Sequence, residues 1–413
     1  MNCSVNIAGK RKEVKYGREV LKAAAEQKKI KIHKNGGSMR QKLAFLAIGL
    51  IIAAGLTVFV SAPKNSIAAT DMTGESCYTI PGATIDVKVI TPEKNVTFNG
   101  IAYIAGHGGH IAIIDMRTMK SPMDIEKDRI VLTEAGSEME GKIAGMSFEE
   151  VKKSGGTHGQ ALIGEKGQKV MIAGTLSGDV YKINLTTGKK EGPFKVGEKF
   201  CGAIVGPDGK IYFEDMADGN VYVWDAQKLK TADKMPVGKA VCGIQWTKNA
   251  KKAYITDMPT GIVYVYNWKT KKKIKEIKSP EMTFIHQARM TPDGKYLWVS
   301  APNEYDPGLK PGTHKSQVII INTKTDKIIK RIILPDNIRP HDFAFTADGK
   351  YAFISSRTYA DDSTLDVMDL RNGNIVRRVS ACASCHKALG IEVKVDKGSP
   401  LLCGVEIDWN PGK

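Results

Sequence analysis

One short pattern recurs five times along this chain with a period of about 40 residues, and it limits the possible folds more than any other feature. Each copy holds a His or Cys, a short alternating run, a turn such as Pro-Asp-Gly-Lys, and a second apolar run. The copies begin at Gly156, Lys199, Ala240, Phe284 and Arg339. Repeats of this length are typical of folds in which each repeat is one structural unit.

The turns and flanking runs of each copy predict a β-hairpin, and a second hairpin follows it. The Asp-Gly pairs at 208–209, 293–294 and 348–349 supply the positive φ that a tight hairpin turn requires. Segments such as "VYVWDAQKLK", which starts at residue 221, have the pattern of a strand, a polar turn and a more charged outer strand. Four strands per repeat make a propeller blade, so we expect an all-β propeller.

The two ends of the repeat region complement each other. The stretch "LLCGVEIDWN" fits the first-strand template through Cys403, whereas Asn99–Thr118 supplies second and third strands without a clear first one. We therefore expect the C-terminal strand to complete the N-terminal blade, which removes an exposed sheet edge. This arrangement gives six blades. In the alternative, Ala83–Lys94 and Leu389–Gly398 form a degenerate seventh.

Two interruptions of the repeat pattern predict excursions from the propeller. The segment 119–155 contains Ser147 and Glu150 at the spacing of a capping box, which predicts a short helix in an insertion. Residues 301–316 are rich in Pro and Gly and predict a long loop on one face of the ring. Such loops are where a propeller usually contacts partners or ligands.

Most of the formal net charge of +17 lies before the repeats. Residues 1–38 form a basic extension, which we interpret as an over-extended reading frame or a cytosolic tail. Residues 39–69 include an uncharged run and a small-residue site at Ser66 and Ala68, as in a secretory signal peptide. We expect the propeller at 70–413 to be exported into a periplasmic-type compartment or an organelle lumen. A membrane is a partner only if this segment stays uncleaved as an anchor, and the body shows no basic stripe typical of nucleic-acid binding.

The His or Cys in each repeat occupies an equivalent position, so these residues should cluster at one mouth of the central channel. They are His158, Cys201, Cys242, His286 and His341. In one interpretation the histidines bind a metal or a non-covalent haem. In the other, which we favour, they hydrogen-bond to neighbouring blades and the cysteines are small apolar groups, so no metal ligand is assigned. His107 and His110 form only a weak H-x-x-H signal.

The segment 380–388 carries Cys382-x-x-Cys385-His386, the spacing that attaches a c-type haem. Two thiols at this spacing reach the two vinyl groups of one porphyrin, and the adjacent imidazole binds the iron. No Met or His follows the motif, so a second axial ligand would come from the propeller or from another chain, or would be absent. In the alternative, the six cysteines of the exported chain form three disulfides, and one such scheme pairs Cys77 with Cys403 and Cys382 with Cys385. The six are Cys77, Cys201, Cys242, Cys382, Cys385 and Cys403.

Other common catalytic motifs are absent from the sequence. It contains no G-x-S-x-G, no H-E-x-x-H and no P-loop, so no catalytic residue is assigned. Carboxylates such as Asp215, Asp257, Asp361 and Asp362 lie on expected turns. We interpret them as turn formers rather than as acid/base pairs.

The segments "TPDGKYLWVS", "TADGKYAFIS", "VIIINTKTDKII" and "LDVMDLRNGNIVRRV" resemble the YVTN family of propeller repeats. Together with the signal segment and the C-x-x-C-H motif, they resemble the propellers of multihaem nitrogen metabolism, in particular the hydrazine synthase family. The resemblance implies a docking beta subunit beside alpha and gamma subunits that carry the catalytic haems. The C-x-x-C-H motif would depart from that family, whose propeller chain is not a known haem carrier.

Three functions therefore remain open. The first is an interaction subunit of an exported multihaem complex. The second is a stand-alone redox protein whose c-type haem at Cys382, Cys385 and His386 exchanges electrons with a cofactor near His286 and His341. The third is a surface or scaffold propeller whose cysteines form disulfides.

Overall fold

The computed structural model describes residues 2–7, 10–15, 84–86, 96–106, 110–120, 129–131, 156–302, 315–335, 338–357, 364–380 and 402–411. The chain divides into two compact units, Met1–Thr73 and Gly74–Lys413. In the first unit, β1 (Asn2–Ile7) and β2 (Lys10–Lys15) form an antiparallel hairpin. The expected signal peptide lies outside the described residues. Within the described ranges, no helix is long and apolar enough to cross a membrane.

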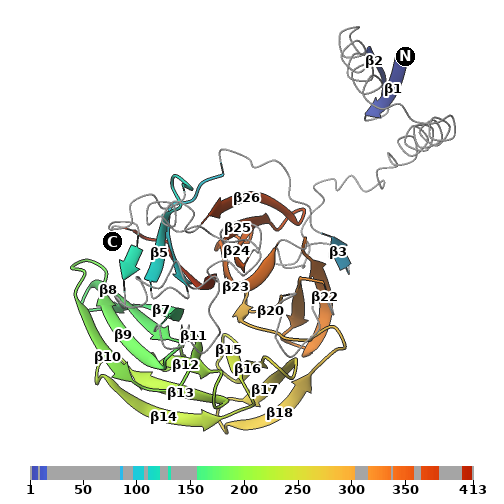
Figure 1. Cartoon of the computed structure of the whole chain (residues 1–413). Coiled ribbons are helices and arrows are strands. Elements are labelled where there is room, and N and C mark those ends of the chain that lie inside the picture. Colours follow the sequence, from blue (N-terminus) through green and yellow to red (C-terminus); the bar gives the residue numbers. More distant parts are fainter. Residues whose placement is uncertain are drawn as a thin grey trace, which may run out of the picture. The chain divides into compact units, whose positions relative to one another are not determined.

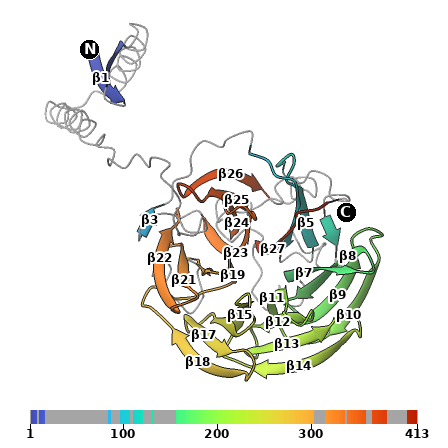
Figure 2. The same cartoon turned by 180° about the vertical axis from the view of Figure 1, so that it is seen from behind.

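The second unit is a six-bladed β-propeller, as Figures 1 and 2 show from two sides. Blades are numbered along the chain, and their strands are given from the innermost to the outermost. Blade 1 contains β7 (Thr157–Glu165), β8 (Gln168–Thr175), β9 (Asp179–Asn184) and β10 (Lys190–Lys195). Blade 2 contains β11 (Phe200–Val205), β12 (Ile211–Asp215), β13 (Asn220–Asp225) and β14 (Lys230–Pro236). Blade 3 contains β15 (Val241–Trp246), β16 (Lys252–Asp257), β17 (Ile262–Asn267) and β18 (Lys272–Ile277).

The remaining blades have the same order, except that two of them take strands from distant parts of the chain. Blade 4 contains β19 (Ala288–Met290), β20 (Tyr296–Ala301), β21 (Gln317–Asn322), β22 (Lys327–Ile333) and β3 (Thr84–Asp86). Blade 5 contains β23 (Arg339–Phe345), β24 (Tyr351–Arg357), β25 (Thr364–Asp369) and β26 (Asn374–Ser380). Blade 6 contains β27 (Leu402–Asp408), β4 (Ile101–Gly106), β5 (His110–Asp115) and β6 (Arg129–Val131).

The ring closes as the sequence predicted. The C-terminal strand β27 pairs antiparallel with β4, with Val405 opposite Ile104 and Ile407 opposite Ala102. Blade 6 is therefore assembled from both ends of the propeller unit. This pairing satisfies the inner edge of β4, which would otherwise be exposed.

The predicted seventh blade is not formed by Ala83–Lys94. Three residues of that stretch, Thr84–Asp86, instead pair in parallel with β22 and extend the outer edge of blade 4. Its other proposed half, Leu389–Gly398, lies outside the described residues. The predicted helical insertion at 119–155 also lies mostly outside them, and its described part includes the short strand β6.

The turn chemistry confirms the predicted hairpins. Gly209, Gly294 and Gly349 have φ angles of 75°, 75° and 68°, in the left-handed region where residues with a Cβ are strained. Each of them lies between the first two strands of its blade. The Asp-Gly pairs therefore form the hairpin turns that the sequence predicted.

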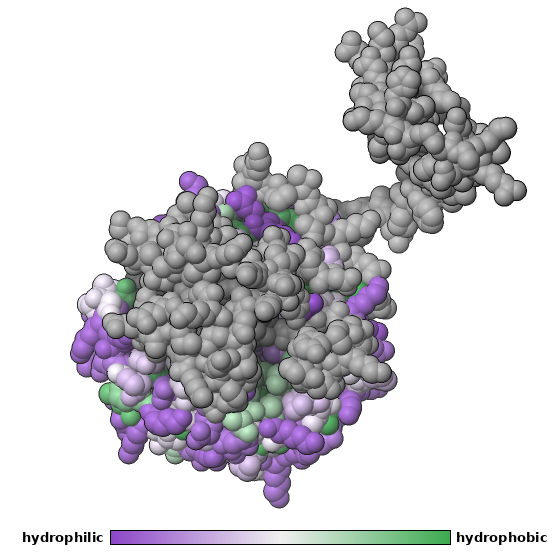
Figure 3. Space-filling view, in the orientation of Figure 1, coloured by the Kyte–Doolittle hydropathy of each residue, from purple (hydrophilic) through white to green (hydrophobic). Residues whose placement is uncertain are grey.

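Apolar side chains hold neighbouring blades together. The buried Trp298 of blade 4 contacts Phe343 and Phe345 of blade 5 edge-to-face, with ring centroids 5.5 and 5.1 Å apart. The outermost strands differ from this core, because most residues of β10, β14 and β18 are exposed. Hydrophilic residues accordingly predominate on this part of the rim in Figure 3.

Antiparallel pairing decides on which face of the ring each connection begins and ends. Connections after the second and the fourth strand of a blade share one face, which we call the upper face, and the other hairpin turns share the opposite face. The connections at 303–314, 358–363 and 381–401 follow β20, β24 and β26. All three therefore leave and re-enter the described structure on the upper face, beside blades 4, 5 and 6.

Candidate functional site

Five innermost strands carry a β-bulge at the recurring His or Cys. In blade 2, Phe200 pairs with Asp215 and Gly202 pairs with Glu214, so Cys201 is an extra residue on its strand. The same shift occurs at His158, Cys242, His341 and Cys403. A bulge bends its strand and re-aims the side chain of the extra residue. The bulges thus turn five of the six equivalent side chains toward the centre of the ring. The sixth, His286, lies two residues before β19 of blade 4, and its ring contacts that of His341.

A glycine after the bulged residue lets the inner strands approach. A Cβ on Gly159 would lie 2.5 Å from backbone atoms of Gly202, and one on Gly243 would lie 2.8 Å from the backbone nitrogen of Ala288. Side chains larger than hydrogen are excluded at both positions. The His/Cys-Gly pair was visible in four copies of the repeat, and it is the signal that could have indicated this close approach.

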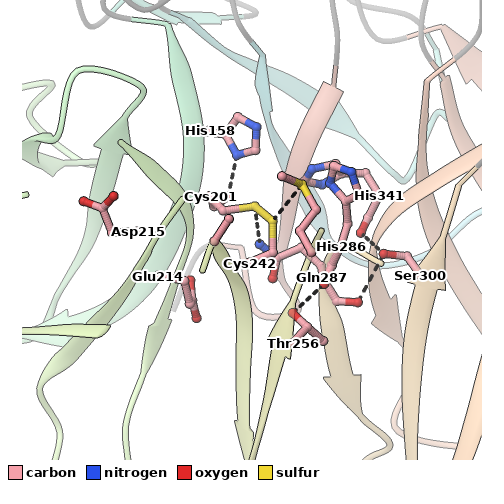
Figure 4. Close-up of a disulfide and its surroundings, with 12 residues drawn as sticks. His158, Cys201, Glu214, Asp215, Cys242, Thr256, His286, Gln287, Ser300 and His341 are labelled. Atoms are coloured by element: carbon pink, nitrogen blue, oxygen red, sulfur yellow. Dashed lines mark hydrogen bonds between the residues drawn. A yellow bond between two sulfur atoms is a disulfide. The ribbon is translucent and has the colours of Figure 1, made fainter. Parts of the chain in front are cut away.

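Cys201 and Cys242 form a disulfide between blades 2 and 3, with a Cα–Cα distance of 4.9 Å (Figure 4). Both residues are fully buried. The interpretation of these two cysteines as separate small apolar groups was therefore wrong. Residues in equivalent positions of consecutive blades are neighbours around the axis, which is why their side chains meet. The predicted pairs of Cys77 with Cys403 and of Cys382 with Cys385 involve residues outside the described ones and remain predictions.

The three histidines cluster, as expected from their spacing. The ring centroids of His158 and His341 are 5.2 Å apart, and those of His286 and His341 are 4.9 Å apart. All three side chains are buried. The Nδ1 atom of His158 is hydrogen-bonded to the backbone carbonyl of Cys201 at 2.5 Å, which links blade 1 to blade 2. This bond agrees with the expectation that the recurring histidines contact neighbouring blades.

Hydroxyl groups on second strands tie each blade to the next. Thr256 donates a hydrogen bond to the carbonyl oxygen of His286 at 2.6 Å, and Ser300 donates one to that of His341 at 2.7 Å. Ser355 donates one to that of Cys403, also at 2.6 Å. All three donors are buried. The backbone beneath the His/Cys cluster is consequently held in a repeating way, and Figure 4 shows the first two of these bonds.

A charged layer lies on the same inner strands. Arg289 forms a bidentate contact with Asp342, with both nitrogen–oxygen distances at 2.9 Å, and reaches Glu406 at 2.7 Å. Burial works against the charged guanidinium, but the two carboxylates overcome this and raise the pKa of Arg289 well above its ordinary value. Burial raises the pKa of Glu406. These three side chains connect blades 4, 5 and 6.

Glu214 is a second buried carboxyl group near the axis. Its Oε1 accepts a hydrogen bond from the backbone nitrogen of Ile244 at 3.0 Å, which links blades 2 and 3, while its Oε2 has no hydrogen-bond partner among the described residues. Burial is the main cause that raises the pKa of Glu214 to about 8. The group is therefore largely protonated at neutral pH.

The predicted turn carboxylates act as turn formers. Asp215 accepts backbone hydrogen bonds from Glu198 at 2.7 Å and from Ala217 at 2.8 Å. Asp257 likewise accepts one from Ala240 at 3.1 Å. Asp361, Asp362 and His107 lie outside the described residues, and His110 begins β5.

The predicted haem ligands Cys382, Cys385 and His386 lie outside the described residues. The structure does place their connection, because β26 ends at Ser380 as the outermost strand of blade 5 and β27 starts at Leu402 as the innermost strand of blade 6. The motif thus lies in the connection that leads into the closing strand. Haem attachment itself remains a prediction.

A surface groove of about 500 Å³ lies on blade 2, beside Trp268 and Lys271 of blade 3. The Lys271 ammonium lies 2.8 Å from the centroid of the Trp268 ring, and burial lowers the pKa of Lys271. Apart from the hairpin-turn residue Asp208, the groove contains none of the residues that the sequence singled out. We therefore place the candidate site at the centre of the ring, where the His/Cys cluster lies.

The fold and its centre define a class: an all-β, six-bladed propeller that is closed by its C-terminal strand around a buried His/Cys cluster. No family model and no curated protein matches the sequence. Among solved structures, the chain is similar to Kuenenia stuttgartiensis hydrazine synthase, with 18% identity and a TM-score of 0.43. That match covers 52% of this chain and spans only 62% of the hydrazine synthase chain.

A second similar structure is a protein of unknown function from Bacteroides caccae. It has 11% identity and a TM-score of 0.50, and the match covers 76% of this chain and 100% of that one. At this level of identity, the likeness shows the propeller fold alone.

Proposed function

We propose that this chain is an exported, non-catalytic propeller subunit that docks multihaem partners in a complex of nitrogen metabolism similar to hydrazine synthase. The observation that carries the proposal is the position of the long connections. The connections at 303–314, 358–363 and 381–401 all start and end on the upper face beside blades 4–6. Loops held by a rigid scaffold are where binding residues concentrate.

The scaffold under this face is closed and internally tied. The ion pairs of Arg289 and the hydroxyl bonds of Ser300 and Ser355 join blades 4, 5 and 6 at their inner strands. Inner strands tied in this way lose little conformational freedom when a partner binds. Blades 4–6 therefore suit a docking role, and we propose that the C-x-x-C-H segment at 380–388 faces the partner there.

The proposal has a test that uses two lysines on opposite faces of one blade. Lys315 precedes β21 on the upper face, and Lys324 follows β21 on the opposite face. Both side chains are exposed. We expect Lys315→Glu to weaken co-purification with multihaem chains several-fold, because it reverses a charge beside the proposed docking loops. Lys324→Glu carries the same charge change and should leave co-purification unchanged.

Native purification from an exporting host that matures c-type cytochromes separates the three functions. Co-elution with multihaem chains supports the docking subunit. A coloured monomer would instead support a stand-alone haem redox propeller, and a colourless monomer would support a scaffold. Equal effects of the two lysine variants would contradict docking through the upper face.

A pyridine haemochrome spectrum and the intact mass of the mature chain test the haem at Cys382, Cys385 and His386. A mass equal to that of the bare polypeptide would rule covalent haem out. N-terminal sequencing of the same material tests export, because cleavage after Ala68 makes Ala69 the first residue.

A further inference from the structure

We infer that His158, His341 and Cys403 form a buried binding site for a transition-metal ion of the zinc class. The imidazole nitrogens and the Cys403 sulfur lie within 4.8 Å of one another. The three side chains are 2%, 0% and 0% exposed. Two imidazoles and one thiolate are a ligand set that suits Zn²⁺ and related borderline-soft ions rather than Mg²⁺ or Ca²⁺. This inference does not depend on the proposed docking function.

The spacing of the three ligand atoms is close to what such an ion requires. Bonds of about 2.0 Å to nitrogen and about 2.3 Å to sulfur place tetrahedral ligand atoms about 3.5 Å apart. The proposed site therefore requires the ligand atoms, which lie within 4.8 Å of one another, to move closer together when the ion binds. On binding, the Cys403 thiol loses its proton to solvent and the thiolate sulfur binds the ion.

The hydrogen bond of His158 prepares this residue as a ligand. A backbone carbonyl can only accept a hydrogen bond, so the Nδ1 atom of His158 must carry the proton that it shares with the carbonyl of Cys201. In the neutral ring, Nε2 is then the nitrogen that carries the lone pair and can bind a metal. Histidine ligands in metalloproteins usually have such a fixed second nitrogen, which sets the tautomer and the ring orientation.

The other two ligands are held through their backbones. Ser300 donates a hydrogen bond to the carbonyl of His341, and Ser355 donates one to the carbonyl of Cys403. Both hydroxyl groups lie on neighbouring blades and are fully buried. Each ligand therefore has one contact that fixes its position independently of the ion, as a built metal site requires.

A second group of potential ligands contains Cys201, His286 and His341. The sulfur of Cys201 is bonded to Cys242, so it offers no thiolate while the disulfide is intact. The group that contains Cys403 does not depend on a sulfur of the Cys201–Cys242 disulfide. We therefore assign the site to His158, His341 and Cys403, and not to the group around His286.

The position of the site gives it a structural role. Cys403 lies on the closing strand β27, whereas His158 and His341 lie on the blades that flank it. A bound ion would join the C-terminal strand to blades 1 and 5. It would complement the disulfide, which joins blades 2 and 3.

Cobalt substitution tests the assignment directly. The full-length, oxidised protein is stripped with a chelator and titrated with Co²⁺, and difference spectra are recorded so that any haem absorbance cancels. We expect about one Co²⁺ per chain, with a thiolate-to-cobalt charge-transfer band, and displacement by Zn²⁺ but not by Mg²⁺. His158→Gln, His341→Gln and Cys403→Ser should each abolish this band and the bound metal.

Two variants are matched controls. His286→Gln removes an equally buried histidine of the cluster, and Cys382→Ser removes a thiol of the other cysteine motif; both should keep the band. Far-UV circular dichroism establishes that each variant is folded. Absence of any band in the folded wild-type protein overturns the inference whatever the variants do. So does loss of the band in His286→Gln together with its retention in His158→Gln.

Discussion

Breaking the bond between Cys201 and Cys242 should cost a large part of the stability of the ring. The two residues are 41 positions apart in the sequence and fully buried. A cross-link that closes a loop of this length lowers the entropy of the unfolded chain and stabilises the folded state by about 4 kcal/mol at 25 °C. That is a substantial fraction of the stability of an ordinary domain.

The measurement compares guanidinium unfolding of the wild-type protein with and without a reductant. Reduction keeps both sulfur atoms in place, so it isolates the effect of the cross-link from the cavity that an alanine would leave. We expect the free energy of unfolding to fall by about 4 kcal/mol on reduction. The double variant Cys201→Ala/Cys242→Ala should be no more stable than the reduced wild type.

The same double variant is also the control for the remaining cysteines. If its stability does not change with the reductant, the loss in the wild type belongs to this disulfide. Equal losses in the wild type and the double variant would refute the reasoning, because the effect would then come from other thiols.

Three further changes have defined outcomes. Glu214 has a pKa raised to about 8, so its contribution to folding is complete below the unfolded-state pKa and is lost as the pH rises through 8. The wild type should therefore lose up to about 1.4 kcal/mol of unfolding free energy per pH unit between pH 5 and 8, relative to Glu214→Gln, which lacks the ionisable group. Thermal melts of both proteins across that pH range measure the difference. Gly261→Ala should lower the melting temperature strongly, since its Cβ would lie 1.5 Å from a backbone oxygen of Met282; Gly188→Ala, also at positive φ but in open space, should cost much less. Ser355→Ala should cost about 1 kcal/mol in denaturant unfolding, and no loss would mean that its bond to Cys403 is not stabilising.

The blade pattern was predictable because it rests on local chemistry. Gly209 and Gly294 mark turns that only a residue tolerant of positive φ makes without strain, and alternating apolar runs flank them. The closure through Cys403 followed from the same template, because an incomplete blade at each end implies a shared one. The parallel pairing of Thr84–Asp86 with β22 could not be predicted, since a short apolar run carries no information about which edge it joins.

The repeat contained part of the information needed to predict the disulfide between Cys201 and Cys242. Cys201 and Cys242 were known to share one position in consecutive blades, and such positions are neighbours around the axis. What the pattern lacked was the direction of the side chains. That direction comes from the β-bulges, which insert one residue into each inner strand and turn it toward the centre.

Many of the polar contacts near the centre of the ring are made by the closing strand β27. Blade 6 takes its inner strand β27 and its other three strands from distant parts of the chain, so no hairpin turn joins β27 to β4. Side chains of blades 1, 4 and 5 contact β27. From blade 1, Gln160 donates a hydrogen bond to the carbonyl oxygen of Gly404 at 2.9 Å, and Lys169 forms an ion pair with Asp408 at 2.5 Å. From blade 5, Asp342 accepts a hydrogen bond from the backbone nitrogen of Val405 at 3.1 Å. Arg289 adds its ion pair with Glu406. Buried ion pairs contribute little net stability in general, because desolvation offsets the attraction, but removing one partner is costly. We interpret their concentration on β27 as a way of holding this strand in one register, at the place where the ring is not closed by a continuous chain.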